Sequence, residues 1–178
     1  SMGRNLSFHP IMDLIRSWAQ IQEDEGEPSA LRKLEASVRR VHPQEAEEIL
    51  PFLATLMGMR LSGPYAERVK GIEGEALETL ILKNLRDLLA KASQRVPLVV
   101  LMEDLHWADA SSLGLLESLF RLAETQGILF LNVFRPGHKE TGDRIVATLQ
   151  ERYPYHHLEI SLQPLAEQES EELIHNLL

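Results

Sequence analysis

Two adjacent acids, Glu103 and Asp104, are the residues of this sequence best suited to metal chemistry. They follow residues 98–102, a short continuous apolar run that is typical of a strand buried on both faces. Ligands of parallel sheets collect where strands end, and carboxylates there are hard oxygen ligands for magnesium. Because side chains alternate along a strand, one acid can face a metal while the other faces an attacking water. The alternative is that the pair only marks where the strand reaches solvent.

Three residues just after these acids have simpler structural explanations. Asp109, followed by Ser111 and Ser112, is expected to cap the next helix. Trp107 is expected to be a packing anchor rather than a surface on which a ligand stacks. His106 either senses a nucleotide through a polar network or is a turn histidine with satisfied hydrogen bonds. The adjacent histidines His156 and His157 have no further metal-ligating residues at a recognisable spacing, so no metal site is expected there.

The second half of the chain alternates strands with helices. Strands are predicted over 98–102, 128–134 and 157–161, and helices over 111–125, 143–152 and from 167 onward. This alternation predicts a parallel sheet with right-handed crossovers, and therefore an α/β fold.

The first half reads as a series of helices. They are predicted over 10–21, from 28, from 43 to 57 and over 75–93, and the stretch 61–74 is predicted to be a loop. We expect one domain in two parts: a helical part over 1–94 and an α/β part over 95–178.

Composition excludes several function classes. The net charge of −9 argues against a nucleic-acid surface, which needs a basic face. No apolar run reaches the roughly 18 residues of a membrane span, so no membrane partner is expected. The chain has no cysteine, which rules out disulfides and is compatible with the cytoplasmic location that we expect.

The acids lie within EDLHWADASSLGLLESL, which resembles the Walker B region of AAA-related P-loop ATPases of the signal-transduction (STAND) class. Three other segments resemble the same class: LSFHPIMDLIRSW, ILFLNVFRPGHKE and LEISLQPLAEQESEELIHNLL. These ATPase modules occur in large bacterial regulators, beside nucleotide cyclase, protein kinase or LuxR-type DNA-binding domains.

The resemblance implies a role for three residues. Glu103 and Asp104 occupy the Walker B positions, for magnesium coordination and water activation. The family usually places Asp first, so which acid holds the metal stays open, although we expect Asp104 to be indispensable. Arg135 matches the sensor-1 arginine, whose guanidinium could reach a γ-phosphate with paired hydrogen bonds. A solvated loop arginine is the alternative. The implied cofactors are ATP and magnesium, in the intact parent protein.

The sequence contains no Gly-Lys-Ser/Thr, so the backbone cradle and lysine of a phosphate-binding loop are missing. We therefore expect a partial P-loop NTPase sheet that binds no nucleotide and has no activity by itself. The parent would be a nucleotide-dependent switch for an attached output domain. The rival hypothesis is a non-enzymatic interaction module with a degenerate ATPase fold.

The resemblance also implies the strand order 5-1-4-3-2, in which strand 128–134 is the fourth. Without the first strand it has a free edge, and no Lys or Pro within it blocks pairing. Either residues 157–161 move inward to pair with it, or a second copy of the chain covers it. We expect the second outcome, a homodimer through the exposed edge.

Overall fold

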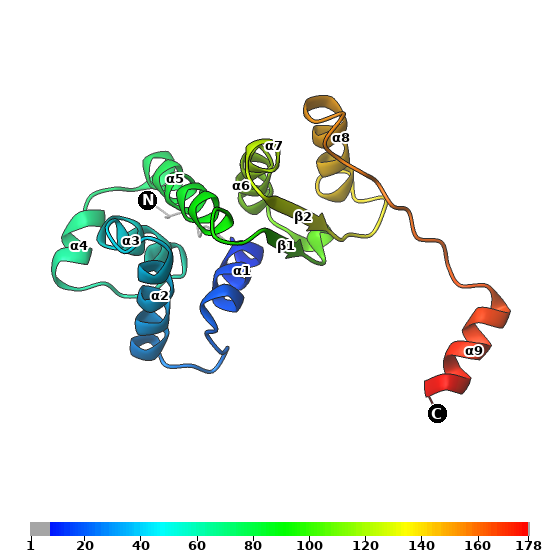
Figure 1. Ribbon diagram of the computed structural model, residues 1–178, viewed down its shortest axis with the longest axis horizontal. Helices are drawn as coiled ribbons and strands as arrows, with labels where there is room; N and C mark the ends of the chain where they lie inside the picture. Colours follow the sequence, from blue (N-terminus) through cyan, green and yellow to red (C-terminus); the bar gives the residue numbers. More distant parts are fainter. Residues whose placement is uncertain (1–7, 178) are drawn as a thin grey trace.

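The computed structural model describes residues 8–177 and forms a helix-rich α/β arrangement around a small parallel sheet (Figure 1). The helices of the first half are α1 (His9–Ala19), α2 (Glu27–Val41), α3 (Ala46–Leu56), α4 (Gly63–Val69) and α5 (Gly74–Ser93). The second half contains β1 (Leu98–Met102), the single-turn 3-10 helix η1 (Leu105–Trp107), α6 (Ala110–Leu119), α7 (Leu122–Thr125), β2 (Ile128–Asn132), α8 (Gly142–Arg152) and α9 (Glu167–Leu177).

In the first half, α2, α3 and α5 pack against one another. Fully buried leucines lie between them, among them Leu34, Leu50, Leu53 and Leu85. Helical spacing places an apolar face on α2 and on α5, as predicted, whereas α3 is buried on all sides over 49–54. The prediction of a loop over 61–74 was wrong for its centre, because α4 occupies 63–69. Pro64 stands in the first turn of α4, where its missing N–H costs nothing, so the Gly-Pro pair marks a helix start.

The sheet is parallel, as predicted, but the described residues contain two strands rather than three. β1 and β2 pair in register, with Leu98 opposite Ile128 and Met102 opposite Asn132. The third predicted strand, 157–161, is not formed. Its alternating pattern suits a strand, but a strand also needs a neighbouring edge to bind, and these residues extend away from β2 (Figure 1). The structure therefore contradicts the inward movement of this segment.

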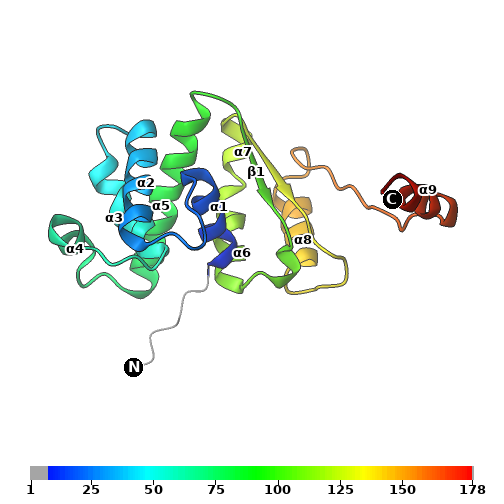
Figure 2. The same ribbon diagram turned by 90° about the horizontal axis from the view of Figure 1, so that it is seen from below.

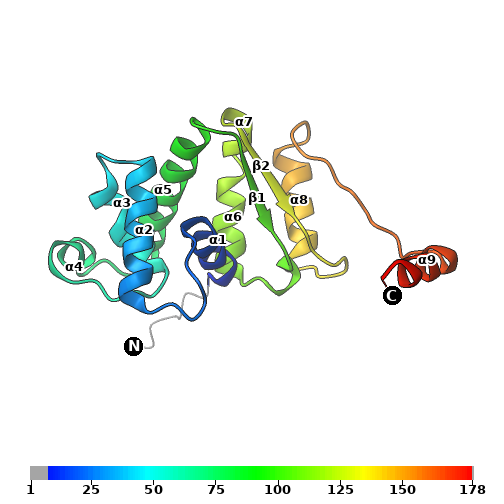
Figure 3. The ribbon, with the colours of Figure 1, turned by 60° about the horizontal axis from the view of Figure 1, so that its bottom comes forward.

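Only one face of the sheet is covered. Val100, Met102 and Ile128 are buried on the side of α6 and α7, whereas Val99 and Leu101 are exposed on the other side. Figure 3 shows the two strands in front of α6 and α8, with no helix across the near side of β2. The prediction that both strands are buried on both faces was therefore wrong for the chain as described. An apolar strand favours burial of both its faces, but its composition does not show whether another element covers each face.

The helix predicted over 111–125 is divided into α6 and α7. Between them the backbone keeps helical angles, but the hydrogen bonds tighten: the amides of Ala123 and Glu124 donate to the carbonyls three residues earlier. The predicted strand 128–134 ends at Asn132, two residues early. Among the described residues, no helix has both the length and the apolar character needed to cross a bilayer.

Candidate functional site

The two strand ends bring the predicted acids and Arg135 to the same end of the sheet. Glu103 and Asp104 follow β1 directly, and Arg135 lies three residues beyond β2. The pairing continues past the strands, because the Val133 amide donates to the Met102 carbonyl over 2.8 Å. The Leu105 amide then donates to the Val133 carbonyl over 3.2 Å. These bonds hold the segment that carries the acids against the segment that leads to Arg135.

Asp104 ends the strand conformation. Its backbone is left-handed, with φ 53° and ψ 29°, and the 3-10 turn η1 begins at the next residue. Strand alternation stops at Met102, so it cannot by itself set the directions of Glu103 and Asp104. Both acids are exposed, and the Asp104 side chain keeps 79% of its surface accessible. An exposed carboxylate at this position is free to bind an incoming cation.

His106 is the buried neighbour of these acids. Its side chain is only 2% exposed, and Nδ1 has no hydrogen-bond partner, so the satisfied turn histidine predicted as one alternative is not what forms. The closest acid oxygen is Oδ1 of Asp104, 3.9 Å from Nδ1. The His106 carbonyl accepts a long 3.4 Å hydrogen bond from the Thr141 hydroxyl. His106 therefore lies between the turn that carries the acids and the loop after β2.

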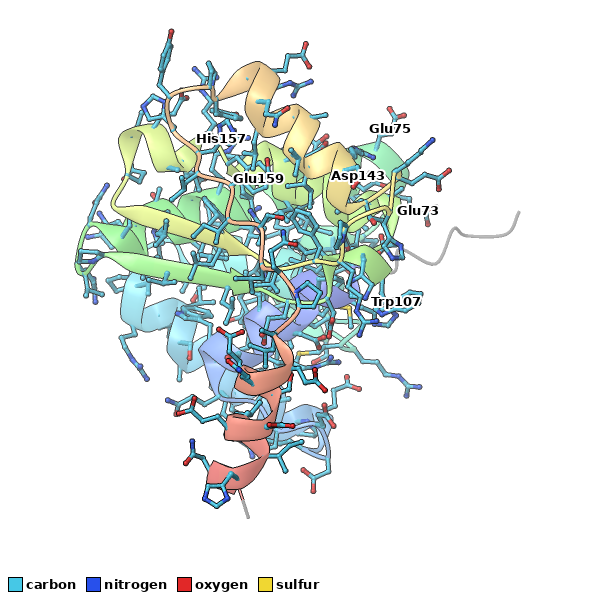
Figure 4. All side chains as sticks on the ribbon, turned by 90° about the vertical axis from the view of Figure 1, so that its right-hand side faces the viewer. Glu73, Glu75, Trp107, Asp143, His157 and Glu159 are labelled. Atoms are coloured by element: carbon cyan, nitrogen blue, oxygen red, sulfur yellow. The ribbon has the colours of Figure 1, made fainter. Side chains whose placement is uncertain are left out.

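Trp107 points into solvent rather than into the core. It is 78% exposed, and Figure 4 shows it at the periphery of the molecule, so its prediction as a packing anchor was wrong. Its ring lies 5.0 Å from that of His106 and 6.1 Å from that of His138, measured between ring centroids. The apolar burial that the anchor prediction required is supplied instead by Leu105, the first residue of the same turn.

The helix that follows begins as predicted. Oδ1 of Asp109 accepts a 2.9 Å hydrogen bond from the Ser112 amide, and Oδ2 accepts a 2.6 Å bond from the Ser112 hydroxyl. This is an N-cap, and it satisfies one of the free amides of the first turn of α6. Asp109 is therefore occupied structurally and is not a candidate ligand.

A half-buried ion pair fixes the helix that follows the Arg135 loop. Arg144 of α8 donates to both oxygens of Glu117 in α6, over 2.8 and 2.6 Å, and the Thr148 hydroxyl adds a third bond. These hydrogen bonds from Arg144 to Glu117 raise the pKa of the arginine above its usual value. Gly142 also lets the Phe134 ring approach the start of α8, where any side chain would collide with it. Both contacts position the loop from Val133 to Thr141.

The acid pair fits magnesium as an incomplete ligand set. Within residues 8–177, no three or more His, Asp or Glu side chains converge on a complete metal site. Magnesium, however, commonly takes only one or two carboxylates and completes its shell with waters and phosphate oxygens. Two exposed, adjacent carboxylates at a strand end match that requirement, whereas a site for zinc or calcium would need more protein ligands.

Two polar groups of this region were not singled out from the sequence. His138 lies against His106, with ring centroids 5.1 Å apart, and the Asn132 Oδ1 is buried without a hydrogen-bond partner. Asn132 interrupts the apolar run at 128–134, which was the available signal for a polar group at the strand end. The sequence contains no comparable signal for His138, because its contact with His106 depends on how the loop after β2 folds back.

Comparison with known proteins gives one match. The family model described as an AAA ATPase domain matches residues 3–131, which include the acid pair and β2 up to Leu131. No curated protein and no solved structure matches the chain.

Proposed function

We infer that this chain, which belongs to the AAA ATPase domain family, forms the magnesium- and water-binding part of an ATP-dependent switch in a longer regulatory protein. The observation that carries the proposal is the placement of Glu103 and Asp104 directly after β1, beside the loop that carries Arg135. Family membership supports a nucleotide-binding ATPase domain. The STAND class, the switch role and the residue assignments are our proposals.

In this proposal the two acids divide the work. Asp104 is exposed and lies close to the buried imidazole of His106. We propose that Asp104 is the acid that is indispensable for hydrolysis. Glu103 supplies the second carboxylate, so that one acid holds the cation and the other accepts the proton of the attacking water. Bound magnesium would offset the negative charge of the phosphate oxygens.

Arg135 is assigned to the transferred phosphate. Its segment leaves β2 at the end of the sheet where the acids lie, and a guanidinium can donate two parallel hydrogen bonds to phosphate oxygens. The loop is held at its far end by the Arg144–Glu117 pair and near its start by the contact between Phe134 and Gly142. A change in the phosphate bound by Arg135 would therefore be transmitted to α8. This is the step through which we propose that nucleotide state reaches an attached output domain, a cyclase, kinase or transcription regulator.

ATP binding separates this proposal from its rival, the non-enzymatic interaction module. Because no Gly-Lys-Ser/Thr is present, calorimetry of the chain alone should give a dissociation constant of about a millimolar or weaker. A longer protein that adds this loop should bind ATP–magnesium at micromolar concentrations. Micromolar binding by the chain alone would contradict the assignment, because a phosphate site would then lie within it. A longer protein that binds no ATP would favour the interaction module.

A further inference from the structure

A buried histidine with an unused ring nitrogen lies beside Asp104. The His106 side chain is 2% exposed, and its Nδ1 has no hydrogen-bond partner among the residues that the structure describes. Leaving a buried polar atom without a partner is destabilising, so such an atom calls for an explanation. Nδ1 has almost no accessible surface, so a further segment of a longer protein could reach it only by displacing the side chains that cover it. Its partner is therefore to be sought among its present neighbours.

The neighbours of the imidazole hold the ring without using Nδ1. The ring centroids of Trp107 and His138 lie 5.0 and 5.1 Å from that of His106. The His106 carbonyl accepts the 3.4 Å hydrogen bond from the hydroxyl of Thr141, the residue just before α8. Figure 2 shows the turn after β1 and the loop after β2 at the same end of the strands, beside α8. Both segments therefore contact His106 and keep its ring in place.

Asp104 is the acceptor within reach of this nitrogen. Its Oδ1 lies 3.9 Å from Nδ1 of His106, which is about 1 Å beyond a normal hydrogen bond. The Asp104 side chain is 79% exposed, and its carboxylate does not cap η1. An exposed side chain changes rotamer within nanoseconds, and such a rotation leaves the left-handed backbone of Asp104 unchanged. The acid can therefore move to the fixed histidine.

We propose that His106 is a positioning residue for Asp104. When the cation binds, Nδ1–H of the neutral imidazole donates a hydrogen bond to one carboxylate oxygen of Asp104, and the other oxygen binds the cation. An ionised carboxylate has acceptor positions for both partners. A hydrogen bond of this kind orients a metal ligand, and it also supplies the missing partner of Nδ1. This role of His106 rests on the proposed function, in which Asp104 belongs to the cation site.

Nitrogen NMR of the wild-type chain tests the donor without any substitution or metal. With ¹⁵N-labelled histidine, the chemical shifts of the two ring nitrogens of His106 report which of them carries the proton. The His106 signals are assigned by their loss from the spectrum of His106→Asn. We expect the neutral ring to carry its proton on Nδ1. A neutral ring with its proton on Nε2 would overturn the proposal, because Nδ1 could then only accept a hydrogen bond.

Two substitutions of His106 separate positioning from packing. Asparagine keeps an N–H donor near the position of Nδ1 but removes the ring, whereas phenylalanine keeps a ring between Trp107 and His138 but has no donor. Manganese binding to each chain is followed by the broadening of the Asp104 amide signal. His106→Phe should weaken binding roughly 10-fold, the lower range for groups that orient metal ligands, and His106→Asn should bind almost as the wild type does. A packing role predicts the reverse order.

The wild-type chain distinguishes a failure of this role from a failure of the cation site. If manganese broadens Glu103 and Asp104 preferentially in the wild type and equally in both variants, the role of His106 is wrong and the site stands. If the wild type shows no such preference, the site is wrong and the role of His106 falls with it. The amide spectra show whether each variant folds. If His106→Phe does not fold, the proton position in the wild type still decides.

Discussion

Replacing Asp104 with asparagine should lower ATP hydrolysis by the longer ATPase on the order of 10²–10⁴-fold, the usual contribution of a positioned acid or base. ATP binding should remain close to that of the wild type, because the phosphate-binding loop supplies most of the affinity. Steady-state turnover and calorimetry on the same preparations measure the two effects separately.

Asparagine is a well-matched replacement at this position. Asp104 has a left-handed backbone, with φ 53°, and asparagine is among the few residues that adopt it readily. The turn into η1 should therefore persist, and the loss should reflect the missing charge rather than a changed fold. Glu103→Gln is the companion variant that shows which acid hydrolysis depends on more. Wild-type turnover by Asp104→Asn would show that Asp104 is only a solvent-exposed acid at a strand end.

Removing the guanidinium of Arg135 should also have a large effect on the longer protein. If it contacts the transferred phosphate, Arg135→Ala should lower turnover by roughly 10³-fold, the lower range for arginines that stabilise phosphoryl transfer. ADP binding should change little, because ADP lacks the phosphate that this residue contacts. The measurements are turnover and the ratio of ATP to ADP affinity.

Lys139→Ala is the matched control, since Lys139 is an exposed cation of the same loop. It removes one positive charge without removing the residue assigned to the phosphate. Equal, small effects of the two substitutions would mean that Arg135 is a solvated loop residue and that only the general charge of the loop matters.

The parts of the fold that sequence reasoning predicted are those with local causes. Helical spacing located α1, α2, α3 and α5, and an apolar run followed by two acids located β1 and its end. The Asp109 cap was predictable for the same reason, because donor and acceptor lie within one helical turn. The common end of the two strands followed from the parallel α/β pattern.

The features that were missed depend on distant neighbours. Residues 157–161 have the pattern of a strand, yet nothing in their own sequence shows whether a strand edge is within reach. Trp107 is apolar and adjacent to a buried turn, but the turn directs Leu105 inward and leaves the indole outside. The contact between His138 and His106 joins residues from two separate loops, and sequence spacing carries no signal for it.

The central claim is that Glu103 and Asp104 form a divalent-cation site, and manganese, a paramagnetic substitute for magnesium, tests it most directly in the chain itself. In amide NMR spectra of the isotope-labelled chain, manganese should broaden the signals of Glu103, Asp104 and Leu105 before those of the exposed acids in α9. Asp104→Asn should remove this preference. Broadening that is strongest in α9, or that is unchanged by Asp104→Asn, would contradict the site.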